Sequence, residues 1–113
     1  MTERMPAGAM TDAAGLTLVH HLVAPDQIVS GSPTTGIHEF DESTGVWEMS
    51  PGAMRDVEVD AVFVVLSGDA LIEFIDAALP SIELRAGSVV RLEEGMRTVW
   101  TVRETVRKVY VAR

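Results

Sequence analysis

The chain has 113 residues, a net charge of −8, 47% apolar residues and no cysteine. This length fits one domain that buries its own core, and the apolar content is too high for a disordered chain. The missing cysteines exclude disulfides, thiolate metal sites and a cysteine nucleophile, and they fit the reducing cytoplasm, where we expect the protein to reside.

Residues 1–14 are rich in Ala, Met and Gly and have no periodic pattern, so we predict a flexible leader before a single domain at 15–113. The leader lacks the basic stretch and apolar run of a signal peptide. The longest apolar run, 61–66, has six residues, against the ~20 needed to span a bilayer. We therefore expect a soluble protein that does not enter a membrane.

From residue 15 onward, short runs rich in Val, Ile, Thr and aromatic residues alternate with turn-forming residues every eight to twelve positions. No window shows the i, i+3, i+4, i+7 pattern of an amphipathic helix. The fold predicted is an all-β antiparallel sandwich or barrel. The predicted strands are 16–22, 35–40, 45–49, 56–66, 70–75, 81–85, 88–92, 97–102 and 106–112.

Charge is unevenly distributed along the chain. Residues 1–84 contain fourteen acidic and two basic side chains, whereas residues 85–113 contain seven basic and three acidic ones. The basic segment is too sparse and too mixed to bind nucleic acid. We expect its arginines to pair with acidic side chains, either within the fold or across a subunit contact.

Several segments resemble the motifs of one protein family. GVWEMSPGAMRD with VFVVLSG, then AGSVVRLEEGMRTVWTV, then ETVRKVYV are similar to the small cupins grouped around the ureidoglycine aminohydrolase cupin domain. The resemblance covers most of the chain and implies a double-stranded β-helix, the cupin jelly-roll barrel, with a pocket at its mouth. The matching residues are Gly45, Trp47, Glu48, Ser50, Pro51, Gly52, Leu66, Gly68, Gly87, Gly95, Trp100, Val102, Arg107, Lys108 and Tyr110.

The resemblance also implies four metal-ligand positions, and this chain departs from them. In metal-binding cupins these positions carry three histidines and a glutamate; here they hold Arg55, Val57, Ala61 and Thr98. Transition metals need imidazole, carboxylate or thiolate donors. We therefore predict that the protein binds no metal cofactor.

Glu58, Asp60 and the three histidines are the candidates for replacement ligands. On a strand, Glu58 and Asp60 share one face and could bind a hard cation or act as an acid–base pair, but we favour both side chains pointing to solvent. His20 and His21 are adjacent and face opposite ways, so they cannot both bind one ion. His38 has no partner at a suitable spacing, and all three histidines are expected at the surface or on an edge strand.

Six residues are predicted to line a pocket in the barrel. Tryptophan offers a broad apolar face for a small organic ligand, and arginine can hold a carboxylate through paired hydrogen bonds. Core packing of the tryptophan Trp100 and salt bridges of the arginines are the alternatives. The pocket candidates are Trp47, Glu48, Arg55, Arg91, Thr98 and Trp100.

Three functions follow from these observations. The first, which we prefer, is metal-free binding of a small molecule in the barrel pocket. The second is a metal-dependent enzyme that resembles the ureidoglycine aminohydrolases and acts on a small ureido or amino compound. The third is a purely structural module whose interior is filled by side chains.

The resemblance and the charge asymmetry together predict a homodimer, because cupin barrels commonly pair through edge strands. Light scattering at micromolar concentration and moderate salt is expected to give the mass of two chains. A monomer mass under these conditions would contradict the prediction.

Overall fold

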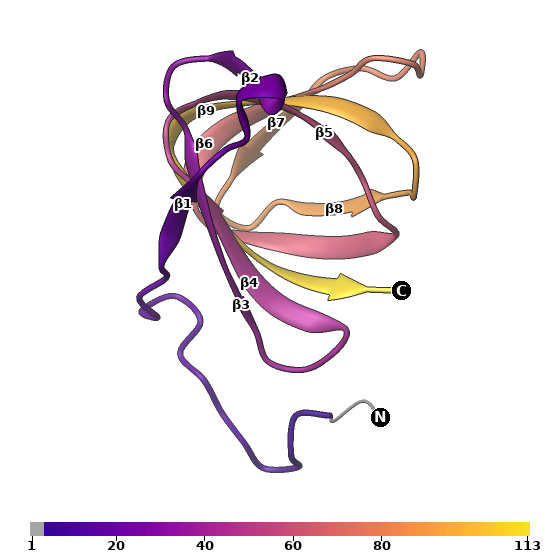
Figure 1. The fold of residues 1–113 in the computed structure, drawn as a ribbon. Helices are drawn as coiled ribbons and strands as arrows, with labels where there is room; N and C mark the ends of the chain where they lie inside the picture. The colour runs from indigo at the N-terminus through magenta and orange to yellow at the C-terminus, as the bar shows by residue number, and fades with distance from the viewer. Residues whose placement is uncertain (1–3) are drawn as a thin grey trace.

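A computed structural model of the chain describes residues 4–113, and its regular secondary structure is almost entirely β-strand (Figure 1). The predicted all-β antiparallel fold is confirmed. No helix in this described range is long and apolar enough to cross a membrane. The strands are β1 (His20–Leu22), β2 (Ile28–Ser30), β3 (Thr34–Glu39), β4 (Thr44–Met49), β5 (Gly52–Val57), β6 (Ala61–Phe74), β7 (Ile82–Arg85), β8 (Val89–Leu92) and β9 (Arg97–Ala112), with a short 3-10 helix, η1 (Pro25–Gln27).

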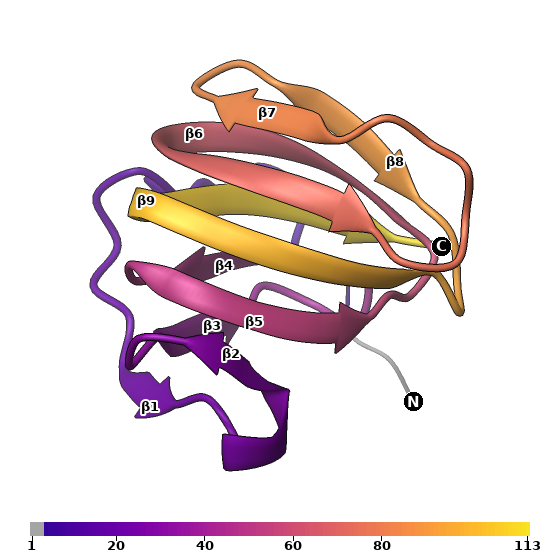
Figure 2. The ribbon, with the colours of Figure 1, turned by 90° about the horizontal axis from the view of Figure 1, so that it is seen from above.

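The two longest strands, β6 and β9, run antiparallel along nearly their whole length and form the spine of one curled sheet. The first half of β6 also pairs with β8, and its second half with β7. On the far edge of β9, β4 pairs with its second half and β5 with its first half. Figure 2 shows the resulting order, with β6, β9 and β5 stacked side by side between β7 and β2.

Both spine strands change direction at their middle, where the β6–β9 register shifts between Val65 and Ala70. Gly68 lies at this point with φ of 103°, a backbone conformation that L side chains rarely adopt. A β-carbon there would meet the backbone oxygen of Thr105 and approach Cα of Val106 to 2.5 Å. The glycine therefore allows the two strands to touch where they bend.

Several predicted strand boundaries were wrong, and those in β6 and β9 were wrong because of this bend. Ser67, Gly68 and Asp69 were interpreted as a turn between two strands, but they form an irregular region inside the continuous strand β6. The predicted strands 97–102 and 106–112 are likewise one strand, β9. The predicted strand 56–66 is divided by a loop at 58–60, and 28–30 forms a strand that was not predicted.

The inward faces of both halves of the sheet meet in one core. The side chains of Trp100, Phe63 and Met49 are the largest that are fully buried. The core is completed by Val23, Met54, Val65, Ala70, Ile72, Leu84, Val90, Leu92, Val102 and Val106.

Four of the six arginines of the basic C-terminal segment, Arg91, Arg97, Arg103 and Arg107, pair with acidic side chains within the fold. Arg103 binds both Asp69 and Glu83, and Arg107 donates to Glu48 at 2.8 Å. The within-fold alternative for the charge asymmetry is therefore confirmed. The Arg103 pairs are solvent-exposed, so water and salt screen them and they contribute little to stability.

We predict that Gly68→Ala destabilises the protein much more than Gly87→Ala. Gly87 also has a positive φ, 94°, but a β-carbon there would meet nothing within 4 Å. Gly87→Ala should therefore lower the free energy of unfolding by about 1–2 kcal/mol, the cost of the conformation alone. Gly68→Ala adds the clash with β9 and should cost roughly 2 kcal/mol more. Equal losses in urea unfolding would contradict this account of the bend.

Candidate functional site

A cavity of about 340 Å³ is open at one end of the core, between β4, β5, β6 and β9. Its size is typical of small-molecule sites. Most of its wall is apolar or aromatic, and three charged side chains interrupt that wall. The lining residues are Ile37, Trp47, Asp56, Val57, Glu58, Val59, Ala61, Phe63, Leu92, Lys108 and Tyr110.

Lys108 is the central polar group of this cavity. It lies on β9 opposite Trp47 of β4 and Val65 of β6. Its Nζ is 4.5 Å from the ring centroid of Trp47, 4.3 Å from that of Phe63 and 4.6 Å from that of Trp100. Three aromatic faces therefore surround the amine, and each attracts it in its charged form.

The amine of Lys108 forms no hydrogen bond or ion pair within 4–113. Burial favours its neutral form and lowers the pKa of Lys108 to about 8, although the nearby charges of Glu58 and Asp56 oppose this shift. Roughly a tenth of the amine is therefore unprotonated at pH 7, and the side chain lines the cavity.

Glu58 lies at the base of the cavity, where its carboxylate is held by two donors. Its Oε2 accepts a hydrogen bond from Oγ1 of Thr98 at 2.6 Å and another from Nε1 of Trp100 at 3.0 Å. Only 8% of Glu58 is exposed. These hydrogen bonds compensate for the loss of water around a buried carboxylate and fix its position.

The prediction that Glu58 and Asp60 both point outward was wrong for Glu58. Its backbone leaves the strand after Val57 and pairs instead with the turn at 95–96, because Glu58 N–H donates to the Met96 carbonyl and Gly95 N–H donates to the Glu58 carbonyl. The alternation of a strand therefore does not apply. Asp60 points away from the cavity and accepts a hydrogen bond from the Glu94 N–H at 2.9 Å.

Asp56 is the second carboxylate on the cavity wall. It lies at the end of β5 and accepts a hydrogen bond from the backbone N–H of Val57 at 2.9 Å. Burial, followed by the charge of Glu58, raises the pKa of Asp56 to about 6. Asp56 can therefore give or take a proton close to neutral pH.

The six predicted pocket residues separate into groups. Trp47 lines the cavity, whereas Thr98 and Trp100 are fully buried behind Glu58 and help to position it. Arg55 is exposed and donates to the Asp26 carbonyl at 3.0 Å beside a smaller hollow. Arg91 is exposed and lies 4.0 Å from Asp60, so neither arginine lines the main cavity.

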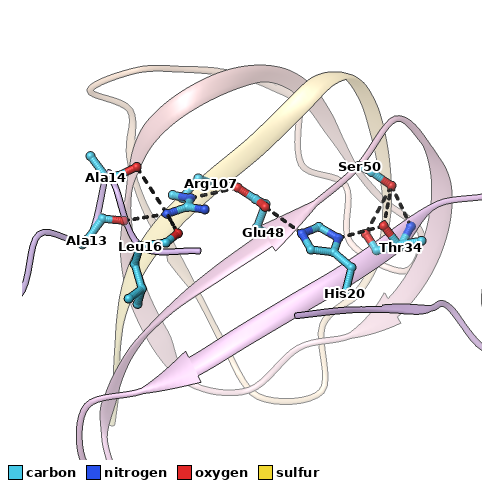
Figure 3. A network of polar contacts seen from close by, with 8 residues as sticks. All are labelled: Ala13, Ala14, Leu16, His20, Thr34, Glu48, Ser50 and Arg107. Carbon is cyan, nitrogen blue, oxygen red and sulfur yellow. Dashed lines mark hydrogen bonds and ion pairs between the residues drawn. The ribbon is translucent and has the colours of Figure 1, made fainter. Parts of the chain in front are cut away.

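Glu48, the remaining predicted pocket residue, lies on the other face of β4 in a chain of polar contacts (Figure 3). Its carboxylate accepts from Arg107 Nε at 2.8 Å and lies 2.6 Å from Nε2 of His20. Although burial opposes it, hydrogen bonding from these two side chains lowers the pKa of Glu48. His20 continues the chain to Thr34 at 2.7 Å, and Thr34 Oγ1 lies 2.9 Å from Oγ of Ser50.

The same network holds the chain that precedes β1. Nη1 of Arg107 donates to the backbone carbonyls of Ala13, Ala14 and Leu16, with the shortest distance, 2.6 Å, to Leu16 (Figure 3). Arg107 therefore connects the predicted leader to the sheet. Glu48 supports this attachment by accepting a hydrogen bond from Arg107, and strand β4 separates its side chain from the cavity.

The four cupin ligand positions do not fit a transition metal. Arg55 points away and already donates to a carbonyl, and Val57 and Ala61 offer only hydrocarbon. The hydroxyl of Thr98 is buried and donates to Glu58. Across the described residues, no three His, Cys, Asp or Glu side chains gather where they could hold a metal ion. These four side chains therefore lack the imidazole, carboxylate or thiolate donors that a transition metal prefers.

Sequence reasoning did not select Lys108, Asp56 or Glu58 as pocket residues. For Lys108 a signal was available, because Val106, Lys108 and Tyr110 alternate along one strand and Val106 is fully buried. A lysine on such a face points inward. For Asp56 and Glu58 no local signal existed, since their orientation follows from the end of β5 and the loop behind it.

Fold and cavity together define a cupin. The profile of the EutQ-like cupin domain (Cupin_3) matches residues 38–110. The chain belongs to this family, which confirms the prediction that it is a cupin. No functionally curated protein matches the sequence significantly.

Solved structures share the fold at low sequence identity. A protein of unknown function of the DUF861 family from Pseudomonas syringae pv. tomato strain DC3000 has a TM-score of 0.73 at 18% identity over 88% of this chain, which spans 45% of that protein. The EutQ protein of Clostridium difficile has a TM-score of 0.68 at 14% identity, covering 99% of this chain and 92% of its own. A putative ethanolamine utilization protein Q from Salmonella typhimurium LT2 has a TM-score of 0.59 at 14% identity, covering 85% and 96% respectively.

We predict that Asp56→Asn stabilises the protein at pH 7. The raised pKa means that the folded state disfavours the carboxylate, so removing the charge should add about 1–3 kcal/mol to the free energy of unfolding. Between the usual pKa of an aspartate and about 6, the folded protein binds a proton at Asp56 more tightly than the unfolded chain does. The contribution of Asp56 to the stability of the wild-type protein therefore falls as the pH rises through this range. The Asp56→Asn variant should not show this fall in the free energy of unfolding with rising pH.

The matched control for this measurement is Asp26→Asn. Asp26 is exposed, and among the residues that the structure describes its carboxylate makes no side-chain hydrogen bond. Urea unfolding from pH 4 to 8 should show the same pH slope for this variant as for wild type. An unchanged slope in Asp56→Asn would contradict the burial of this carboxylate.

Proposed function

We propose that this protein binds a small organic molecule in the cavity around Lys108 without a transition metal. The observation that carries the proposal is the position of an amine amid three aromatic rings, without a partner among residues 4–113, in a cavity that also holds Asp56 and Glu58. Partial burial costs the charged form of this amine free energy in the empty protein, because its lost hydration is not replaced by a hydrogen bond to a described side chain. Binding a polar group of a ligand would recover that energy.

The shape of the wall supports a specific orientation of the ligand. Trp47 and Phe63 provide flat apolar surfaces on which the body of a small molecule can pack. Its polar end would then reach Lys108 and the two carboxylates. This arrangement follows the usual design of small-molecule sites, in which few polar groups set the orientation and apolar walls contribute most of the affinity.

The metal-dependent alternative, an activity resembling the ureidoglycine aminohydrolases, finds less support. Such an enzyme activates water on its metal, and the four positions that would hold the metal here offer one hydroxyl already bonded to Glu58. Elemental analysis after dialysis separates the two functions. A stoichiometric transition metal would favour the enzyme and overturn the metal-free proposal.

We predict that selected compounds from a panel of small carboxylates, amines, ureido compounds and carbonyl compounds raise the Tm of the protein. A ligand at 100 times its Kd adds about 2.7 kcal/mol to stability, which corresponds to several degrees in a domain of this size. Trp47→Leu should abolish the shift because it removes one cavity wall. The control Val89→Ala, at an exposed site outside the cavity, should retain it.

A further inference from the structure

Lys108 is the one lysine in the chain; the other eight basic residues are arginines. Within the described residues, arginines form the exposed salt bridges, which join Arg91 to Asp60, Arg97 to Asp76, and Arg103 to Asp69 and Glu83. The one primary amine among the side chains is placed in the cavity instead. A guanidinium can form salt bridges as well as an amine, but only an amine becomes a nucleophile when it loses its proton.

The surroundings of this amine are those of a nucleophile and not of a structural ion pair. Its Nζ has three rings within 4.3–4.6 Å and no carboxylate within ion-pair distance in the described part of the chain. Of the two carboxylates on the wall, Glu58 is bonded to Thr98 and Trp100. Asp56 accepts only the N–H of Val57 through Oδ1, which leaves its other oxygen available to the cavity.

We propose that the amine of Lys108 forms a reversible imine with a small aldehyde or ketone that enters the cavity, and that Asp56 transfers the protons of this reaction. The inference rests on the proposed function, because the carbonyl compound occupies the same cavity. It adds the chemical class of the ligand and a covalent step.

The step balances without a further reactant. The lone pair of Nζ attacks the carbonyl carbon, the C=O π bond breaks, and a proton passes from nitrogen to oxygen to give a carbinolamine. Protonated Asp56 then donates to the hydroxyl group, the C–O bond breaks, and water leaves as the C=N bond forms. Loss of the remaining N–H proton restores protonated Asp56, and hydrolysis reverses each step.

The pKa values of Lys108 and Asp56 support this reaction in addition to the geometry of the cavity. With pKa values of about 8 for Lys108 and about 6 for Asp56, both the neutral amine and the protonated acid are present near neutral pH. The other titratable groups facing the amine are Glu58 and Tyr110. The apolar wall formed by Phe63, Ala61 and Leu92 surrounds the reacting carbon and limits competing water.

Reductive trapping tests the proposal on the full chain. The protein is incubated with a concentration series of propanal and sodium cyanoborohydride, and the alkylated positions are quantified by peptide mass spectrometry. With a single lysine, modification is confined to Lys108 and the α-amine. An α-amine has an ordinary pKa of about 7.7–8.0, close to that of Lys108. It is therefore an internal reference of equal basicity in the same tube.

The rate at Lys108 is expected to saturate with propanal and to exceed the rate at the α-amine, which should rise linearly. Asp56→Asn should lower the Lys108 rate by about tenfold or more, because it removes the proton donor. The matched control Asp60→Asn makes the same chemical change on a side chain that points away from the cavity, and it should react as wild type does. Circular dichroism confirms that each variant is folded.

A linear Lys108 rate no faster than that of the α-amine overturns the proposal, as does an unchanged rate in folded Asp56→Asn. Failure of the imine is distinguishable from failure of the proposed function. If compounds raise the Tm of wild type but not of Lys108→Met while no adduct forms, the cavity binds ligands without covalent chemistry. If no compound raises the Tm and no adduct forms, both proposals fail.

Discussion

The antiparallel pairing of β6 with β9 is the constraint on which the rest of the structure depends. Each strand is long enough to belong to both halves of the curled sheet, and each bends where Gly68 lets the two backbones touch. Side chains on the inner faces of both strands must therefore meet at the centre. Phe63 of β6 and Trp100 and Lys108 of β9 come together for this reason, although they lie far apart in sequence.

The cavity combines two kinds of buried charge that differ in how they are stabilised. Glu58 receives two strong hydrogen bonds from neighbours that are themselves fully buried, so its position is rigid. Lys108 receives only the attraction of three rings, and desolvation shifts it toward its neutral form. A rigid carboxylate beside a weakly held amine gives the site one fixed and one reactive polar group.

Membership of the EutQ-like cupin family explains the barrel fold, but it does not explain which side chains line the cavity. The three solved structures described above are under 20% identical to this chain, and a fold of this kind hosts many chemistries. At the ligand positions that the cupin resemblance implies, this chain has Val57 and Ala61, and both side chains form part of the apolar cavity wall. Function must therefore be argued from the side chains around Lys108.

The sequence alone determined the all-β class, the cupin resemblance and the lack of metal donors at the expected positions, because strand periodicity, glycine spacing and residue chemistry are local properties. The alternation of Lys108 with the buried Val106 along one strand also indicated that Lys108 points inward. Only the tertiary structure decided that Gly68 lies inside a bent strand, that Glu58 turns inward, and that Glu48 faces Arg107 instead of the cavity. These outcomes depend on contacts between segments 35 to 60 residues apart, which no local pattern encodes.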